Sequence, residues 1–230
     1  GKLALLGMNQ RLRRRLLTAA RMLGEGVIGR IYYAKAWWLR QSPSPEMLIA
    51  RKEWGMSRQL SGGGPLMDIG VHVLDKVLAC LDFPEVSGVS AGLSTGIGKD
   101  IAHSYNLDYE VEDFVCGLIH CADGCRIHLE ASFFHAFDGK ETQGIMIHGE
   151  NGYFDGENIF QRKPGSTEYH PVPLSPDETY PQSSEEHFVH ILSGEAEPLA
   201  TLEQGLAELQ LIEALYRSAD RNGQFEPLSS

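Results

Sequence analysis

The sequence predicts an α+β fold in which an antiparallel-rich sheet carries helices on one face. Short segments of strand-like alternation, separated by turn residues, dominate the region from residue 86 to residue 172. Asp123-Gly124 supplies a strong hairpin turn within this region. Helical patterns precede and follow this run of strands rather than interrupt it, which is typical of an α+β arrangement of layers.

The individual elements follow from local patterns. A helix is expected over residues 13–23, because apolar side chains share one face and glycines follow. Residues 31–40 alternate as a strand, residues 41–63 form a long irregular stretch, and residues 65–81 form a second helix. Further strands are expected over residues 86–93, 111–121, 125–134, 144–148, 152–154, 159–162 and 169–172.

Two helices are expected to close the chain. Ser183-x-x-Glu186 and Thr201-x-x-Gln204 are capping boxes, in which each side chain satisfies a backbone N–H at the helix start. Gly194 and Gly223 stand where these helices should end.

Composition bounds the class of protein. A chain of 230 residues with 42% hydrophobic residues can bury about 70% of its unfolded surface as one domain. A formal charge of −11 argues against nucleic acid as a general partner, and no apolar run approaches the ~20 residues of a membrane span. The four cysteines show no disulfide framework, and the chain start lacks the plan of a signal peptide. We therefore expect a cytoplasmic protein that binds neither nucleic acid nor membranes.

The only basic cluster is Arg11-x-Arg13-Arg14-Arg15. We interpret it as the solvated face of the opening helix. Binding of phosphate or nucleic acid, or contact with a further domain, is the alternative.

A glycine-rich turn leads into the helix over residues 65–81: Ser61-Gly62-Gly63-Gly64-Pro65-Leu66-Met67-Asp68-Ile69-Gly70-Val71-His72. Glycines permit positive φ and let a ligand come close, and Pro65 suits the first helical position. Asp68 and His72 are one turn apart, so the carboxylate can orient the imidazole and bias its charge. Asp68, His72, Asp75 and Lys76 fall on one polar stripe, which indicates either a cleft lining or an ordinary solvent-facing surface.

This segment resembles the signature of the Gfo/Idh/MocA family of nicotinamide-dependent oxidoreductases. Other segments match that family in order: Asn9-Gln10-Arg11-Leu12, Gly26-Val27-Ile28-Gly29-Arg30-Ile31, Val111-Glu112-Asp113, Gly149-Glu150-Asn151-Gly152 and Glu186-His187-Phe188. The resemblance implies a C-terminal substrate domain built on a large, open, mostly antiparallel sheet (dihydrodipicolinate-reductase/GAPDH C-terminal-like).

The family's N-terminal Rossmann domain is not recognisable in this sequence. Gly96-x-Gly98 is the nearest glycine pair, and we expect neither a βαβ unit nor a following helix around it. Residues 1–8 resemble the last strand of a Rossmann domain. We therefore expect residues 1–230 to be one substrate-binding, catalytic and oligomerisation domain, inactive alone, whose NAD or NADP is bound chiefly by the missing domain.

The resemblance implies hydride exchange with a hydroxyl carbon of a sugar, sugar acid or cyclitol. His72 would act as the acid or base and Asp68 would support it, although a lysine of the missing domain could instead be the principal base. Arg40, Trp38, Trp54 and His135 are expected to bind substrate, with core packing or a surface position as the alternative for each. We expect no metal site.

Two other functions remain open: an NAD-dependent glycosidase on the same scaffold, and a non-catalytic sugar-binding or regulatory module. The resemblance also implies a homodimer or homotetramer formed through the free face of the sheet. Phe114, Leu118, Phe133 and the tryptophans could supply that face, with core packing as the equal alternative for each.

Overall fold

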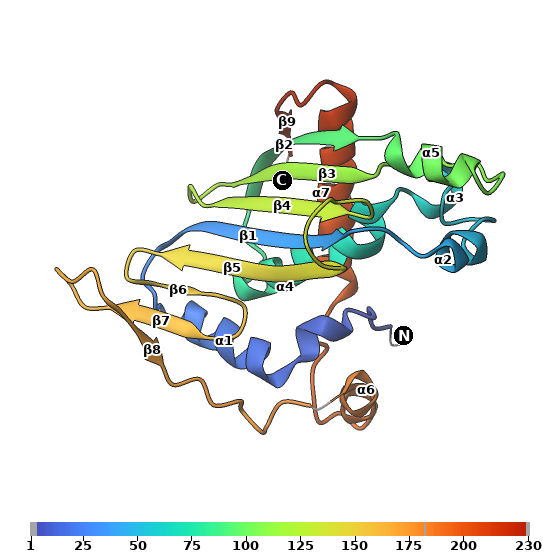
Figure 1. The fold of residues 1–230 in the computed structure, drawn as a ribbon. Coiled ribbons are helices and arrows are strands. Elements are labelled where there is room, and N and C mark those ends of the chain that lie inside the picture. The colour runs from blue at the N-terminus through green and yellow to red at the C-terminus, as the bar shows by residue number, and fades with distance from the viewer. Residues whose placement is uncertain (1–3, 182, 229–230) are drawn as a thin grey trace.

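The computed structural model describes residues 4–181 and 183–228, and its strands form one open sheet backed by helices (Figure 1). Nine strands lie in the order β8-β7-β6-β5-β1-β4-β3-β2-β9. The predicted α+β class and the open, mostly antiparallel sheet are confirmed. The strands are β1 (Ile31–Arg40), β2 (Val86–Ser94), β3 (Phe114–Cys121), β4 (Arg126–Ser132), β5 (Glu141–Gly149), β6 (Gly152–Phe154), β7 (Ile159–Arg162), β8 (Tyr169–Val172) and β9 (Glu226–Pro227).

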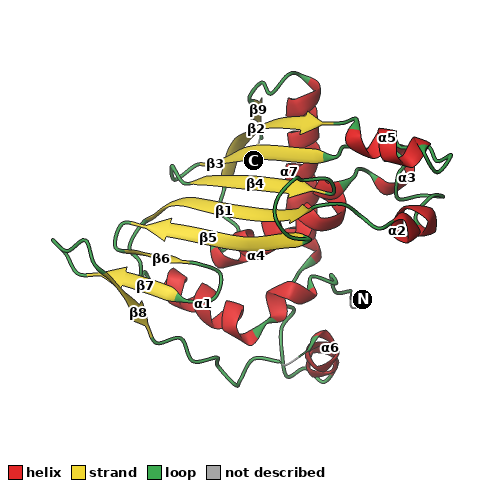
Figure 2. Cartoon of the chain, in the orientation of Figure 1, coloured by secondary structure: helices red, strands yellow, loops and turns green. Residues whose placement is uncertain are grey.

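The helices gather behind the sheet and at one end of it (Figure 2). They are the 3₁₀ turn η1 (Asn9–Leu12), α1 (Arg14–Gly24), α2 (Pro45–Ala50), α3 (Arg58–Ser61), the π-helical turn η2 (Leu66–Gly70), α4 (Val71–Cys80), α5 (Ile97–His103), α6 (Ser184–Leu192) and α7 (Leu202–Asp220). Among the described residues, none of the helices is long and apolar enough to cross a bilayer.

The two faces of the sheet differ in burial. Along β3 and β4 alternate side chains, among them Ile119 and Leu129, are fully buried, and those between them are partly exposed. The buried side chains pack against α1, α4 and α7, so the core lies between the sheet and these helices. The other face is free of helices (Figure 1).

One strand pair is parallel, β1 with β4, and the other neighbours are antiparallel. The register sets Trp38 on β1 opposite Ala131 on β4 and Gln143 on β5. Because the peptide chain alternates faces at each residue, Trp37 and Trp38 point to opposite sides of the sheet. Trp38 is accordingly buried on the helix side, and Trp37 is partly exposed.

Local signals located most elements correctly. The strand over residues 31–40 and the helix over residues 13–23 are confirmed as β1 and α1. Both closing helices begin at their predicted caps: Ser183 Oγ accepts from the Glu186 N–H, and Thr201 and Gln204 form the complete capping box.

Three expectations were wrong. Residues 41–63 contain α2 and α3 rather than only irregular chain, and β9 was not predicted. A helix, α5, does follow Gly96-x-Gly98, because the distant Asp113 carboxylate accepts hydrogen bonds from the Ile97 and Gly98 amides and caps it. The strand after α5 runs antiparallel to β2, so the segment is still not a βαβ unit.

Candidate functional site

The glycines before α4 make room for protein rather than for ligand. A Cβ on Gly63 would lie 1.8 Å from the Tyr216 hydroxyl oxygen, and one on Gly64 would lie 2.6 Å from the Glu112 carbonyl oxygen. Both glycines are buried. The expectation that these two positions let a ligand approach is therefore wrong, since α7 and the segment before β3 occupy that space.

Glu112 caps the start of this helical region from 46 residues away. Its carboxylate, in a side chain only 3% exposed, accepts hydrogen bonds from the Gly64 and Leu66 amides at 3.0 and 3.1 Å. Tyr216 Oη donates a third bond at 2.8 Å, and burial raises the pKa of that phenol, so it stays protonated as a donor. A negative charge here also suits the positive end of the helix. The Glu-Asp pair before β3 thus holds helix starts: Glu112 holds this one and Asp113 holds α5.

Asp68 lies in the π-helical turn that precedes α4. A π-turn widens the helix locally, and such turns are frequent at functional sites. Asp68 Oδ2 accepts a hydrogen bond from Arg51 Nη1 at 2.7 Å, and both side chains are about 30% exposed. Among the described residues, neither a hydrogen bond nor an ion pair joins Asp68 to His72. The structure therefore pairs Asp68 with Arg51, a residue that the sequence analysis did not single out.

His72 stands at the first turn of α4 beside the buried Trp38 of β1. The two ring centroids are 6.0 Å apart, with the rings tilted by 48°. His72 Nδ1 and Trp38 Nε1 are both buried, and neither has a hydrogen-bond partner among the described residues. Buried polar atoms are normally hydrogen-bonded to protein or water, so these two neighbouring ring nitrogens are left available to a water or a polar ligand.

Arg40 lies two residues after Trp38 on β1 and adds a cation to the pair formed by His72 and Trp38. Its guanidinium lies 5.2 Å from the centre of the Trp38 ring, and its Nε donates to Glu141 Oε2 at 2.8 Å. Cation–π contact and the ion pair hold the guanidinium beside Trp38. The structure therefore places Trp38 in contact with both His72 and Arg40.

Trp54 and His135 are placed differently. Trp54 is 51% exposed and lies 5.8 Å from the guanidinium of Arg51, on the Asp68 side of the group. The backbone N–H of His135 donates to the Arg40 carbonyl at 2.7 Å, but its ring stacks on Phe114 at 5.8 Å. Phe114 belongs to the free face of the sheet, so the structure does not bring the His135 ring to His72.

The expected polar stripe on α4 does not line one cleft. Asp75 is 1% exposed and forms a buried ion pair with Arg11, whose Nη1 also donates to the Leu199 carbonyl at 2.7 Å. Arg11 is thus a buried anchor, and its interpretation as part of a solvated basic face is wrong. Lys76 is also buried, in a different cavity, so only Asp68 and His72 of the stripe belong to the candidate site.

A second acid lies beside Asp75. Glu208 of α7 is 1% exposed, and neither of its carboxyl oxygens accepts a hydrogen bond from a described residue. Burial, and then the nearby Asp75, raise the pKa of Glu208 to about 9. Glu208 is therefore protonated at neutral pH, and Arg11 faces one negative charge rather than two.

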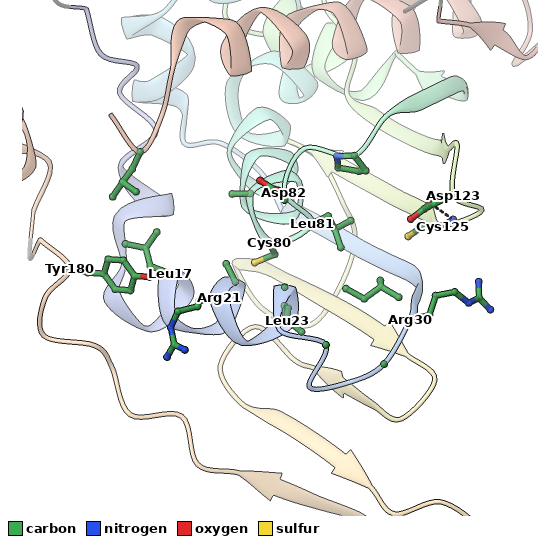
Figure 3. A pocket seen from close by; sticks show the side chains of 18 residues that line it. Leu17, Arg21, Leu23, Arg30, Cys80, Leu81, Asp82, Asp123, Cys125 and Tyr180 are labelled. Carbon is green, nitrogen blue, oxygen red and sulfur yellow. Dashed lines mark hydrogen bonds between the residues drawn. The ribbon is translucent and has the colours of Figure 1, made fainter. Parts of the chain in front are cut away.

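A cavity of about 810 Å³ lies at the other end of α4, where the ends of α1 and α4 meet the β3–β4 turn (Figure 3). Its walls include Arg21, Cys80 and Cys125. Its lining includes Gly26, Gly29 and Arg30 of one matching segment, but none of the residues expected to be catalytic or substrate-binding, and no histidine among the described residues. We therefore place the candidate site at the start of α4.

An acid and an imidazole therefore stand at the start of a glycine-led helix that packs against an open, mostly antiparallel sheet. The sequence matches the family described as "GFO/IDH/MocA C-terminal domain" over residues 16–155, and the chain belongs to this family. The recognition made from the sequence is confirmed.

Named relatives and solved structures agree with this assignment. The chain is 30% identical over 221 residues to "D-glucoside 3-dehydrogenase" of Escherichia coli (strain K12), covering 87% of this chain and 58% of that protein. It is 29% identical over 224 residues to "1,5-anhydro-D-fructose reductase" of Ensifer adhaerens, covering 93% and 62%. A structure of "Levoglucosan dehydrogenase, complex with NADH and levoglucosan" superposes with a TM-score of 0.76 at 19% identity, covering 99% and 67%. The chain thus spans about three fifths of the length of the curated relatives.

Proposed function

We propose that this chain is the substrate-binding and catalytic half of an NAD(P)-dependent dehydrogenase that acts on a sugar, sugar acid or cyclitol. The observation that carries the proposal is the buried, unpartnered Nδ1 of His72 beside the unpartnered Nε1 of Trp38. The names of the relatives support the reaction class, because they are a sugar dehydrogenase and a sugar reductase.

Each residue of the group has a distinct role in this proposal. His72 takes the hydroxyl proton when the alcohol is oxidised and returns it in the reverse direction, since imidazole titrates near neutral pH. Asp68 offers Oδ1 to a substrate hydroxyl, while Arg51 holds Oδ2. Trp38 donates its Nε1–H to the substrate, and the exposed face of Trp54 stacks on a sugar ring.

Arg40 and His135 are the remaining expected substrate residues. Arg40 has a place beside Trp38, although Glu141 already accepts from its Nε, so it would contact substrate through its terminal nitrogens. His135 contributes through its backbone bond to Arg40 rather than through its ring.

The residues near His72 fit the nicotinamide end of a dinucleotide, because a donor and a histidine nitrogen are left unpaired there. The pyrophosphate has no comparable place at Gly96-x-Gly98, since Asp113 already accepts from the Ile97 and Gly98 amides. When bound, the nicotinamide supplies the hydride acceptor or donor. We propose that a separate Rossmann domain holds most of the dinucleotide and that the described chain supplies the substrate side.

We also propose that the protein assembles as a homo-oligomer through the free face of the sheet. Phe114 and Leu118 of β3 lie on that face and are partly exposed, as is Trp37 of β1. Phe133, which was considered for the same face, is 7% exposed in the core and contributes nothing to it.

The test of the catalytic role uses the full-length protein that carries this chain together with its dinucleotide-binding domain. His72→Ala should lower kcat about 10²–10⁴-fold without changing the thermal midpoint, because a positioned acid or base contributes about that much. His170→Ala, at an exposed position on β8, is the matched control.

Accumulation of reduced nicotinamide with a sugar identifies a dehydrogenase. Cleavage of a glycoside without net cofactor turnover would instead identify an NAD-dependent glycosidase. Sugar binding without any turnover would identify a binding module. If His72→Ala keeps full turnover, the role assigned to His72 is wrong.

A further inference from the structure

One helical turn beyond His72, Lys76 faces a cavity of about 250 Å³. The cavity lies between α1, α4, the start of β5 and the loop after β6. Lys76 is only 8% exposed, yet its ammonium makes neither a hydrogen bond nor an ion pair with any described residue. Its nitrogen is not among the fully buried unpartnered atoms, so it opens onto the cavity as a positive charge that no described residue pairs with.

The other charges around this cavity are mostly committed to each other. Glu157 lies 3.5 Å from Arg15 Nε, and Asp155 Oδ1 accepts from the backbone amides of Glu157 and Asn158. Arg13, which also lines the cavity, has an exposed side chain that pairs with no described residue.

Two uncompensated cations therefore share one cavity. Burial lowers the pKa of Lys76, and repulsion from Arg13 lowers it further, while Cys80, Asp75 and Glu157 act in the opposite direction. Asp75 is held by Arg11 and Glu157 is exposed, so neither neutralises the ammonium locally. A small anion between Lys76 and Arg13 would relieve both the burial cost and the repulsion.

His72 does not line this cavity, but two features place the cavity close to the candidate site. Lys76 follows His72 by four residues, so the two share a face of α4 about 6 Å apart along its axis. Gln143 lines the cavity and is the β5 partner of Trp38, whose ring contacts His72. Partners across an antiparallel pair project to the same side of the sheet, which places Gln143 beside Trp38.

We propose that Lys76 and Arg13 bind a small oxyanion, and that this anion is the carboxylate of a sugar-acid substrate whose reacting hydroxyl lies at His72. This inference rests on the proposed function and narrows its substrate class. His72 and Lys76 are separated by one helical turn along α4. A six-carbon sugar acid can span this separation, with its carboxylate at Lys76 and a secondary hydroxyl at His72.

The binding experiment is isothermal titration calorimetry of the 230-residue chain with D-glucuronate, D-glucose and inorganic phosphate at equal ionic strength. Glucuronate should bind more tightly than glucose. Lys76→Met should weaken glucuronate binding about tenfold or more, as expected for loss of a charge-assisted hydrogen bond, and leave glucose binding unchanged. Lys163→Met, at an exposed turn position, is the matched control and should behave as the original chain.

Lys76→Met keeps the length of the buried side chain, and Arg13→Gln changes an exposed residue outside the core. A loss of glucuronate binding in both variants would therefore reflect loss of the binding site rather than loss of the fold. Glucuronate binding that survives both substitutions overturns the proposal. Phosphate binding that depends on Lys76, without glucuronate binding, keeps the oxyanion site and overturns its assignment to the substrate.

Turnover by the full-length protein separates this inference from the proposed function. Oxidation of glucose but not glucuronate, dependent on His72, refutes the sugar-acid assignment alone. Absence of hydride exchange with both sugars, despite Lys76-dependent glucuronate binding, refutes the dehydrogenase and retains the anion site.

Discussion

Glu112 offers the sharpest test of how the candidate site is held together. Its Oε1 accepts from the Leu66 amide and from Tyr216 Oη, and its Oε2 accepts from the Gly64 amide. In Glu112→Gln the new carbonyl can keep the two bonds at the Oε1 position, but the NH₂ group then faces the Gly64 N–H. One charge-assisted bond is lost outright and the other two lose their ionic component.

Each hydrogen bond to a charged group contributes about 1.5–3 kcal/mol, so Glu112→Gln should reduce the free energy of unfolding by about 2–4 kcal/mol. At a typical slope of about 2 kcal/mol per M urea, the unfolding midpoint should fall by about 1–2 M with the slope unchanged. Urea unfolding followed by circular dichroism measures this directly.

The matched control is Glu110→Gln. Glu110 accepts one hydrogen bond, from Ser57 Oγ at 3.0 Å, and is exposed, so its substitution should change the unfolding free energy by less than about 1 kcal/mol. Equal midpoints for the two variants would show that Glu112 does not anchor the helix and would remove the basis for treating the start of α4 as rigidly placed.

Three further predictions concern α7, the glycine turn and the sheet. Because the pKa of Glu208 is raised to about 9 in the folded chain, the folded state keeps this proton over a pH range in which the unfolded state loses it. The free energy of unfolding should therefore be highest below about pH 4 and should fall as the pH rises toward 9, by up to about 1.4 kcal/mol per pH unit. Urea unfolding from pH 5 to pH 9 should show this slope, which should be flatter in Glu208→Gln but unchanged in the exposed control Glu213→Gln. Gly63→Ala should destabilise the chain by about 1–3 kcal/mol through overpacking, whereas Gly24→Ala, with no atom within 4 Å of the new Cβ, should not lower the thermal midpoint. Leu118→Arg should reduce the mass measured by light scattering to that of a monomer, and an unchanged mass would refute assembly through the free sheet face.

Sequence reasoning succeeded where the determining contacts are local. The caps at Ser183 and Thr201 bind amides three residues away, and the alternation along residues 31–40 is intrinsic to one strand. It failed where a distant residue decides the structure. The helix after Gly96 exists because Asp113 caps it, and Asp68 pairs with Arg51 from a region that looked irregular.

The candidate site shows the same division. The motif drew attention to Asp68 and His72, and β1 places Trp38 beside His72 and Arg40 beside Trp38. The ring of His135 was misplaced because residues beyond the end of β4 turn toward the free face, where Phe114 meets it. No local pattern carries that information.

The family segments that flank the Asp68–His72 motif have a structural role, which their contacts with the helical region of the motif reveal. Arg11, from the segment Asn9–Leu12, is bound to Asp75 in the middle of α4, and Glu112, from Val111-Glu112-Asp113, is bound to the amides at its beginning. His72 lies between these two attachments. The two attachments therefore restrain the part of α4 that carries His72, whose ring centroid lies 6.0 Å from that of Trp38. Arg11 and Glu112, from two of the matching segments, thus bind the helical region that carries His72, one of the histidines with a ring nitrogen that has no partner among the described residues.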